Sequence, residues 1–257
     1  MTDEIKGSIF ITGAASGIGE ATATLFHSKG WFVGLFDLNE AKLESLKEVL
    51  SSRVMIYKGD VNNSEDISNA MNSFVNSSDG SIDVLFNSAG VLITGDFAYN
   101  TLSSYQKLID INLKGTINCI HHAIPFLAKS KKAQIINMSS ASAIYGTPQF
   151  AVYSASKFGI RGLTEALNVE LQQFRIKVCD VMPSFTDTLM LRNIEKHPSS
   201  VKCLGIALRA EDVAKVVWKS LGSKRVHHYA PLSTKVLSFI SNLFPWSSKI
   251  IMKYISN

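Results

Sequence analysis

Short apolar runs alternate with longer stretches of helical pattern along almost all of this 257-residue chain. Near-continuous apolar runs are typical of strands in a parallel sheet that helices cover on both faces. Regular alternation of such strands with helices predicts a doubly wound α/β fold. The expected strands, about seven in number, cover residues 8–11, 31–36, 54–57, 82–86, 134–138, 177–182 and 228–230.

A glycine-rich segment, 12–19, lies between the first expected strand and the first expected helix. Glycines permit a tight turn and a close backbone approach to a diphosphate. The following helix start offers unpaired N–H groups and the positive end of its dipole to that anion. Glycines also serve ordinary turns, but here strand and helix flank them as a Rossmann-like dinucleotide site requires. The expected contacts are Gly13, Ser16, Gly17, Ile18 and Gly19.

A carboxylate follows the second expected strand. Asp37 comes 18 positions after Gly19, close to the spacing of ~20 expected for a residue that binds the adenosine ribose hydroxyls. The carboxylate would repel a 2′-phosphate, and neither Ser16 nor Leu38 supplies a compensating cation. The residues therefore favour NAD over NADP, unless Asp37 merely ends a strand.

The net charge of +5 is unevenly distributed. The segment 213–257 holds seven of the 26 basic residues and none of the 21 acidic ones, which leaves the rest of the chain slightly acidic. This asymmetry indicates an interaction surface on the tail and argues against a nucleic-acid-binding protein, since no such motif is present.

The tail has two short helical patterns separated by Pro245. One apolar face comprises positions 236, 237, 240, 243 and 244, and a second includes Ile250 and Tyr254. Three interpretations remain open. The faces pack over a substrate pocket or a partner subunit, they anchor the protein at a membrane surface, or the basic tail docks an acidic carrier or coenzyme-linked substrate.

Compartment signals are sparse. No signal-peptide pattern and no run of ~18 apolar residues occurs, so we expect a cytoplasmic protein, with the membrane surface as the alternative. Cys119, Cys179 and Cys203 form no metal-binding pattern and are expected to be core residues in a reducing compartment, with no metal site.

Several motifs together resemble the short-chain dehydrogenase/reductase family, over about residues 5–231. The glycine segment has the family's Thr-Gly-x-x-x-Gly-x-Gly spacing, and Tyr153 and Lys157 match its Tyr-x-x-x-Lys. The other matching positions are Asp60, Val61, the run Asn87-Ser88-Ala89-Gly90, Asn112, Ser140 and Thr188. The resemblance implies that Asp60, Val61, Asn87, Ala89, Gly90, Tyr153, Lys157, Pro183 and Thr188 also hold the cofactor. Ser184 replaces the family's usual Gly after Pro183, which puts the local turn geometry in question.

The resemblance implies a separate catalytic role for each of three residues. Tyr153 exchanges a proton with the substrate oxygen, Ser140 hydrogen-bonds that oxygen, and Asn112 holds a relay water. Tyr153 and Lys157 are four residues apart on a helical pattern, so they share one face. A neighbouring ammonium favours the phenolate, which would move the pKa of Tyr153 toward the working pH.

The expected pocket is apolar, which favours a small hydrophobic secondary alcohol or ketone. Its expected residues are Ser140, Ile144, Phe150, Phe185 and Leu189. We expect a cofactor-binding and catalytic domain over 1–231, with a substrate lid over 188–208, and a basic amphipathic extension over 232–257. The alternatives are a membrane-associated reductase of lipidic or carrier-linked carbonyls and a non-catalytic, redox-sensing NAD-binding protein. The resemblance also implies a homodimer or homotetramer.

Overall fold

The computed structural model describes residues 6–194, 198–206, 208–244 and 246–256. Its main sheet has seven parallel strands in the order β3-β2-β1-β4-β5-β6-β9, which confirms the predicted doubly wound fold. The strands are β1 (Ser8–Thr12), β2 (Phe32–Asp37), β3 (Val54–Lys58), β4 (Val84–Asn87), β5 (Gln134–Met138), β6 (Lys177–Pro183) and β9 (His227–Ala230). A separate parallel pair, β7 (Thr186–Asp187) and β8 (Leu208–Arg209), was not predicted, since two-residue strands carry no periodic signal.

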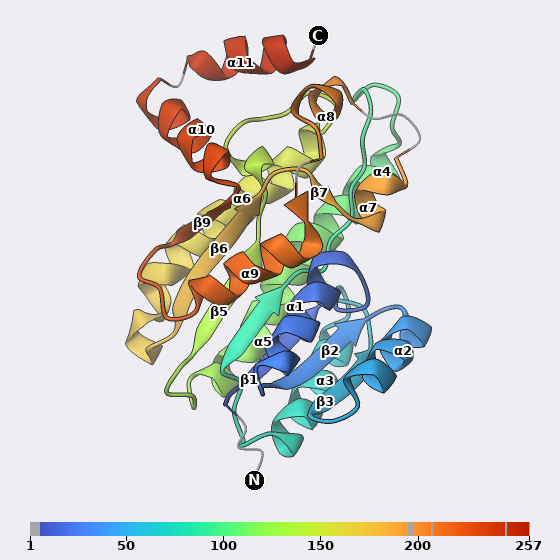
Figure 1. The fold of residues 1–257 in the computed structure, drawn as a ribbon, viewed down its shortest axis with the longest axis vertical. Coiled ribbons are helices and arrows are strands. Elements are labelled where there is room, and N and C mark those ends of the chain that lie inside the picture. The colour runs from blue at the N-terminus through green and yellow to red at the C-terminus, as the bar shows by residue number, and fades with distance from the viewer. Residues whose placement is uncertain (1–5, 195–197, 207, 245, 257) are drawn as a thin grey trace.

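Helices cover both faces of the sheet (Figure 1). The described helices are α1 (Gly17–Ser28), α2 (Glu40–Leu50), α3 (Ser64–Ser77), α4 (Leu102–Ile109), α5 (Gly115–Leu127), α6 (Ala151–Glu170), α7 (Leu189–Arg192), α8 (Ser199–Leu204), α9 (Ala210–Ser220), α10 (Leu232–Leu243) and α11 (Ser247–Ser256). A π-helical turn (Asp110–Lys114) joins α4 to α5, and 3-10 turns occupy Ala141–Ala143 and Leu171–Phe174.

Alternating side chains of β1 divide the core into two layers. Ile9 and Ile11 join a buried cluster with side chains of α1, α2 and α9. Phe10, between them, joins a second cluster with side chains of α3 and α5. Successive strand residues point to opposite faces, so a strand covered on both sides must be apolar at every position. This explains why the strands read as unbroken apolar runs.

The tail forms the two short helices that the sequence predicts, α10 and α11. Figure 1 shows both at the end of the molecule farthest from β3 and α3, with α11 beside α8. Pro245 lies outside the described residues, as do 195–197 and 207 of the expected lid. Among the described helices, none is long and apolar enough to cross a bilayer.

The cysteines differ from expectation at one position. Cys119 and Cys179 are buried, but Cys203 on α8 is exposed. Cys203 therefore does not belong to the core.

Candidate active site

A cavity of ≈ 380 Å³ lies at the carboxyl ends of the central strands. Strand order reverses between β1 and β4, and open α/β sheets bind ligands at such a switch point. The cavity extends from the loop after β1, past the ends of β4, β5 and β6, to the tail helices. One end of the cavity therefore lies beside the glycine loop and the other beside the tail helices.

The glycine loop packs closely against the segment that follows β4. Gly13 has a φ of +66°, and a Cβ there would lie 2.7 Å from the Cα of Ala89. Gly13, Ser16, Gly17 and Ile18 line the cavity. The Ser16 side chain makes no capping hydrogen bond to α1, so first-turn N–H groups remain open to an anion.

Gly19 acts differently from the other glycines. It does not line the cavity. A Cβ at Gly19 would overlap the carbonyl oxygen of Gly13, so this glycine permits α1 to pack against the loop.

Asp37 lies at the end of β2 and lines the cavity. One carboxylate oxygen accepts the Ala15 N–H at 3.1 Å and the other accepts the Asn39 N–H at 2.9 Å. The register partner of Asp37 on β3 is Lys58, whose ammonium pairs with Glu40 at 2.9 Å. The carboxylate is thus held rigidly, with its charge not neutralised by Lys58.

The segments after β3 and β4 separate into lining and supporting residues. Asp60, Val61, Ala89 and Gly90 line the cavity, as the resemblance implies. Asn87 does not. It is buried in the sheet, where its Nδ2 donates to Asn137 Oδ1 at 2.9 Å.

Ser140, Tyr153 and Lys157 meet at the cavity wall, from the end of β5 and from α6. The Ser140 hydroxyl is near enough to that of Tyr153 to favour its ionised form. Lys157 is buried, donates to the Met138 carbonyl at 2.8 Å, and places its Nζ 5.5 Å from the centroid of the Tyr153 ring. The predicted juxtaposition of these three groups is therefore present.

Burial shifts the pKa values of Tyr153 and Lys157 in opposite directions. Burial raises the pKa of the Tyr153 hydroxyl, although the Ser140 hydroxyl opposes the rise. This is the opposite of the direction expected from the neighbouring ammonium. Burial also lowers the pKa of Lys157 to about 8, since desolvation disfavours the charged form of each group. Burial therefore favours the protonated form of the Tyr153 hydroxyl.

Asn112 lies beside the cavity but does not line it. It sits in the π-helical turn, 1% exposed. Its Oδ1 accepts the Val91 N–H at 2.8 Å, and its Nδ2 donates to the Val91 carbonyl at 2.9 Å. Its amide therefore holds the loop that follows β4, where Gly90 and Val91 line the cavity.

In the segment after β6, Ser184 stands where the family usually has a glycine. Ser184 has no positive φ, so this turn does not require glycine. Its N–H donates to the Ala230 carbonyl at 2.8 Å. Thr188 lines the cavity and lies against the glycine loop, since a Cβ at Gly17 would be 3.3 Å from its Cγ2. Pro183 lines the cavity as well.

The far end of the cavity is apolar. Phe150, Phe185 and Leu189 line it as predicted, whereas Ile144 is buried outside it, in a cluster with Met182. The closeness of Ile144 to Ser140 in the chain predicts a place in the wall. The 3-10 turn after Ser140 instead directs it into the core.

Two lining residues of the tail were not predicted individually. Leu237 of α10 and Met252 of α11 reach the cavity, and Tyr145 donates its hydroxyl hydrogen to the Leu237 carbonyl at 3.2 Å. The signal was the helical spacing of apolar residues in the tail, one interpretation of which was packing over the pocket. In the described part of the chain, no group of three or more His, Cys, Asp or Glu could hold a metal ion.

Fold and site together define a Rossmann-fold enzyme site, with a glycine loop for a dinucleotide and a Ser-Tyr-Lys group beside it. The chain belongs to the short chain dehydrogenase family, whose model matches residues 8–199. It is 31% identical over 222 residues to an uncharacterized oxidoreductase of Staphylococcus aureus strain MW2, covering 86% of this chain and 92% of the relative. A Staphylococcus epidermidis oxidoreductase is 32% identical over 180 residues, which is 70% of this chain and 78% of that protein.

Solved structures share the fold. A short chain dehydrogenase/reductase from Burkholderia phymatum, in complex with NAD, superposes with a TM-score of 0.83 at 22% identity, covering 95% of each chain. A 3-ketoacyl-(acyl-carrier-protein) reductase from Brucella melitensis, complexed with NADH, superposes with a TM-score of 0.77 at 22% identity, covering 90% of this chain and 93% of the other.

Proposed function

We propose that this protein transfers a hydride between NAD(H) and a hydrophobic secondary alcohol or ketone, with Tyr153 as the general acid and base. The observation that supports this most directly is the contact of Ser140 with Tyr153, beside the buried Lys157, where the glycine-loop end of the cavity meets its apolar end. A bound nicotinamide would supply or accept the hydride.

Side chains of the protein then protonate and hydrogen-bond the substrate oxygen. In the reducing direction, the Tyr153 hydroxyl gives its proton to the carbonyl oxygen as the carbonyl carbon gains the hydride, which forms the alcohol. Ser140 hydrogen-bonds the same oxygen and stabilises its developing charge. Lys157 would hold the nicotinamide ribose and stabilise the tyrosinate that remains. We assign Asn112 to positioning the cavity wall through Val91, in place of direct contact with a relay water.

NAD is the cofactor that the adenosine end of the cavity favours. Among the described lining residues, Lys157 is the single cation, and it lies at the catalytic end. Asp37 would accept hydrogen bonds from ribose hydroxyls and repel a phosphate there. The NAD-bound and NADH-bound structural neighbours agree with a nicotinamide cofactor.

The division into domains and the assembly are proposed as the sequence predicts them. We propose a catalytic domain over 1–231 with a lid over 188–208, and an extension over 232–257 that completes the pocket. A cytoplasmic homodimer or homotetramer is the assembly that the family resemblance implies.

A second candidate substrate is a lipidic or carrier-linked carbonyl. Leu237 and Met252 extend the apolar wall beyond the catalytic group, which favours a long acyl or alkyl chain over a compact alcohol. Turnover of alcohols and ketones of increasing chain length separates the candidates: a kcat/KM that rises with length supports the lipidic one.

The test of the chemistry is Tyr153→Phe. Loss of the proton donor should reduce kcat by about 10²–10⁴-fold, measured by nicotinamide absorbance across a panel of alcohols and ketones with NAD and NADP in parallel. Cofactor binding, measured by titration calorimetry, should persist. The matched control is Tyr105→Phe, which removes an exposed hydroxyl that donates to the Phe97 carbonyl.

Nearly unchanged hydride transfer in Tyr153→Phe would show that the acid–base assignment is wrong. A wild-type chain that binds NAD but turns over no substrate would favour the redox-sensing alternative.

A further inference from the structure

Helix α10 presents its apolar residues to solvent and its small polar residues to the protein. Thr234 and Ser238 are buried against the body, where Ser238 hydrogen-bonds the Tyr229 hydroxyl at 3.0 Å. The exposed side chains at helical spacing are Leu232, Val236, Phe239, Ile240 and Leu243. A helix that stabilises a globular fold buries its apolar face. The predicted face 236, 237, 240, 243 and 244 is thus mostly outward, with Leu237 alone directed into the cavity.

The outward apolar surface continues through the turn and along α11. Phe244 and Trp246 make an edge-to-face contact and are 48% and 69% exposed. Ile250 and Tyr254, one turn apart on α11, are also exposed. Of the 21 large exposed hydrophobic residues in the described chain, nine follow Pro231. Such a concentration marks an interaction surface.

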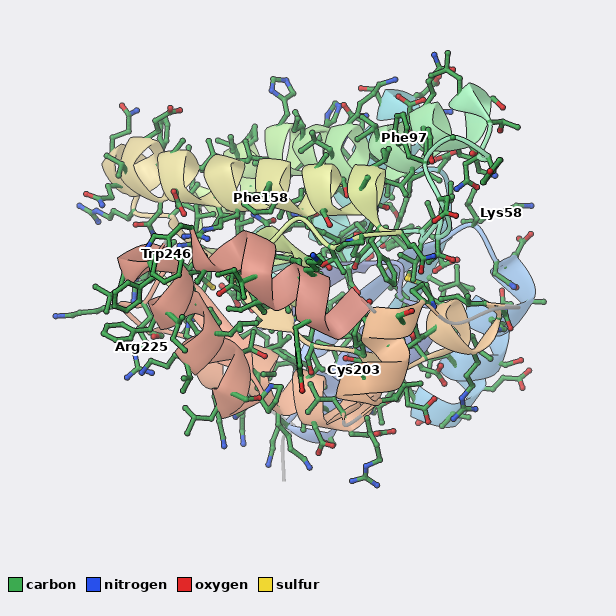
Figure 2. The ribbon with its side chains drawn as sticks, turned by 90° about the horizontal axis from the view of Figure 1, so that it is seen from above. Lys58, Phe97, Phe158, Cys203, Arg225 and Trp246 are labelled. Carbon is green, nitrogen blue, oxygen red and sulfur yellow. The ribbon has the colours of Figure 1, made fainter. Side chains whose placement is uncertain are left out.

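The charge around this surface has one sign. Lys235 on α10 and Lys253 on α11 are exposed beside the apolar side chains of the same helices. The tail contains no acidic residue. In the view of Figure 2, Trp246 lies at the left of the molecule and Phe97 toward the upper right, well apart from it. An occupant of this surface must accept aromatic and aliphatic side chains and carry negative charge.

We infer that the outward faces of α10 and α11 dock the protein on an anionic lipid bilayer. Amphipathic helices with aromatic and aliphatic residues on one side and lysines beside them lie in the interfacial plane of a bilayer, where tryptophan and tyrosine rings prefer the headgroup level. Anionic lipids attract the adjacent lysines. A second copy fits less well, because it would bring the same basic tail against this one.

Docking would connect the bilayer to the active site. The inner sides of the same two helices provide Leu237 and Met252 to the cavity wall. A bilayer-dissolved alcohol or ketone would therefore reach the cavity past α10 and α11. Docking itself does not depend on the proposed chemistry, since lipid binding is measured without turnover.

The test is flotation of the full chain with vesicles of phosphatidylcholine alone and of phosphatidylcholine with about 30% phosphatidylglycerol, an anionic lipid. The variant Phe239→Ser/Trp246→Ser removes two exposed aromatics and leaves the cavity intact. The control Phe97→Ser/Tyr99→Ser removes two aromatics of comparable exposure, 65% and 86%, on another part of the surface. Circular dichroism and melting temperature verify that all variants fold.

Wild type and control should float with the anionic vesicles, and the tail variant should bind about a hundredfold more weakly, because two buried aromatic side chains are lost from the bilayer. Lys235→Gln/Lys253→Gln should weaken binding to the anionic vesicles by about fivefold per lysine. No flotation of the wild type, or equal flotation of the tail variant, would overturn the inference. A wild-type dimer that the tail variant converts to monomer, with no vesicle binding by either, would assign the surface to a second copy.

Discussion

Replacing Asn112 with alanine should destabilise the fold, because the Asn112 side chain satisfies both backbone groups of Val91. The variant loses the hydrogen bonds at 2.8 and 2.9 Å, and each backbone group left unsatisfied costs about 1–3 kcal/mol when buried. Val91 is half-buried, so water can reach part of it. We therefore expect a loss of about 2–3 kcal/mol in the free energy of unfolding.

Urea unfolding followed by tryptophan fluorescence measures this loss. The matched control is Asn72→Ala, since Asn72 is exposed on α3 and donates to the Ser68 carbonyl at 2.9 Å; it should lie within about 0.5 kcal/mol of wild type. Cofactor affinity should also fall in Asn112→Ala, because Gly90 and Val91 line the cavity. An Asn112→Ala variant as stable as the control, but catalytically impaired, would refute the positioning role and favour direct contact with a relay water.

Three further outcomes are expected. Asp37→Asn should narrow the preference for NAD over NADP by about tenfold or more, from about 1–3 kcal/mol of charge repulsion removed; an unchanged kcat/KM ratio for the two cofactors would contradict the role of Asp37. The buried Asp180, 2.9 Å from His227, raises the pKa of that imidazole against the opposing effect of burial. The charged imidazole should therefore contribute stability that is lost as pH rises from about 6.5 through the raised pKa of His227. Over that range, urea unfolding of His227→Gln and wild type should show a difference that shrinks with pH. Met252→Ala should raise KM for long-chain substrates more than for short ones, and an equal change for both would remove Met252 from the substrate wall.

Most of the residues that local pattern and spacing single out line the cavity. The glycine loop, Asp37 and the Tyr153–Lys157 pair depend on residues close in the chain, at the end of a strand or one helical turn apart. Parallel strands then carry their carboxyl ends to one edge, so motifs far apart in the sequence meet there. Predictions that depended on side-chain direction were less accurate. Asn87 and Ile144 are supporting residues, because their side chains point into the sheet and the core.

By itself, the sequence determined the seven-strand sheet, the order of the motifs and the basic character of the tail, because periodicity and charge are local properties. Tertiary structure alone decided that Asn112 holds Val91 and that burial raises the pKa of Tyr153. It also decided that α10 turns its apolar residues outward while Leu237 and Met252 close the cavity. An apolar helical face specifies that something must cover it, but only packing against the rest of the chain decides which face remains available.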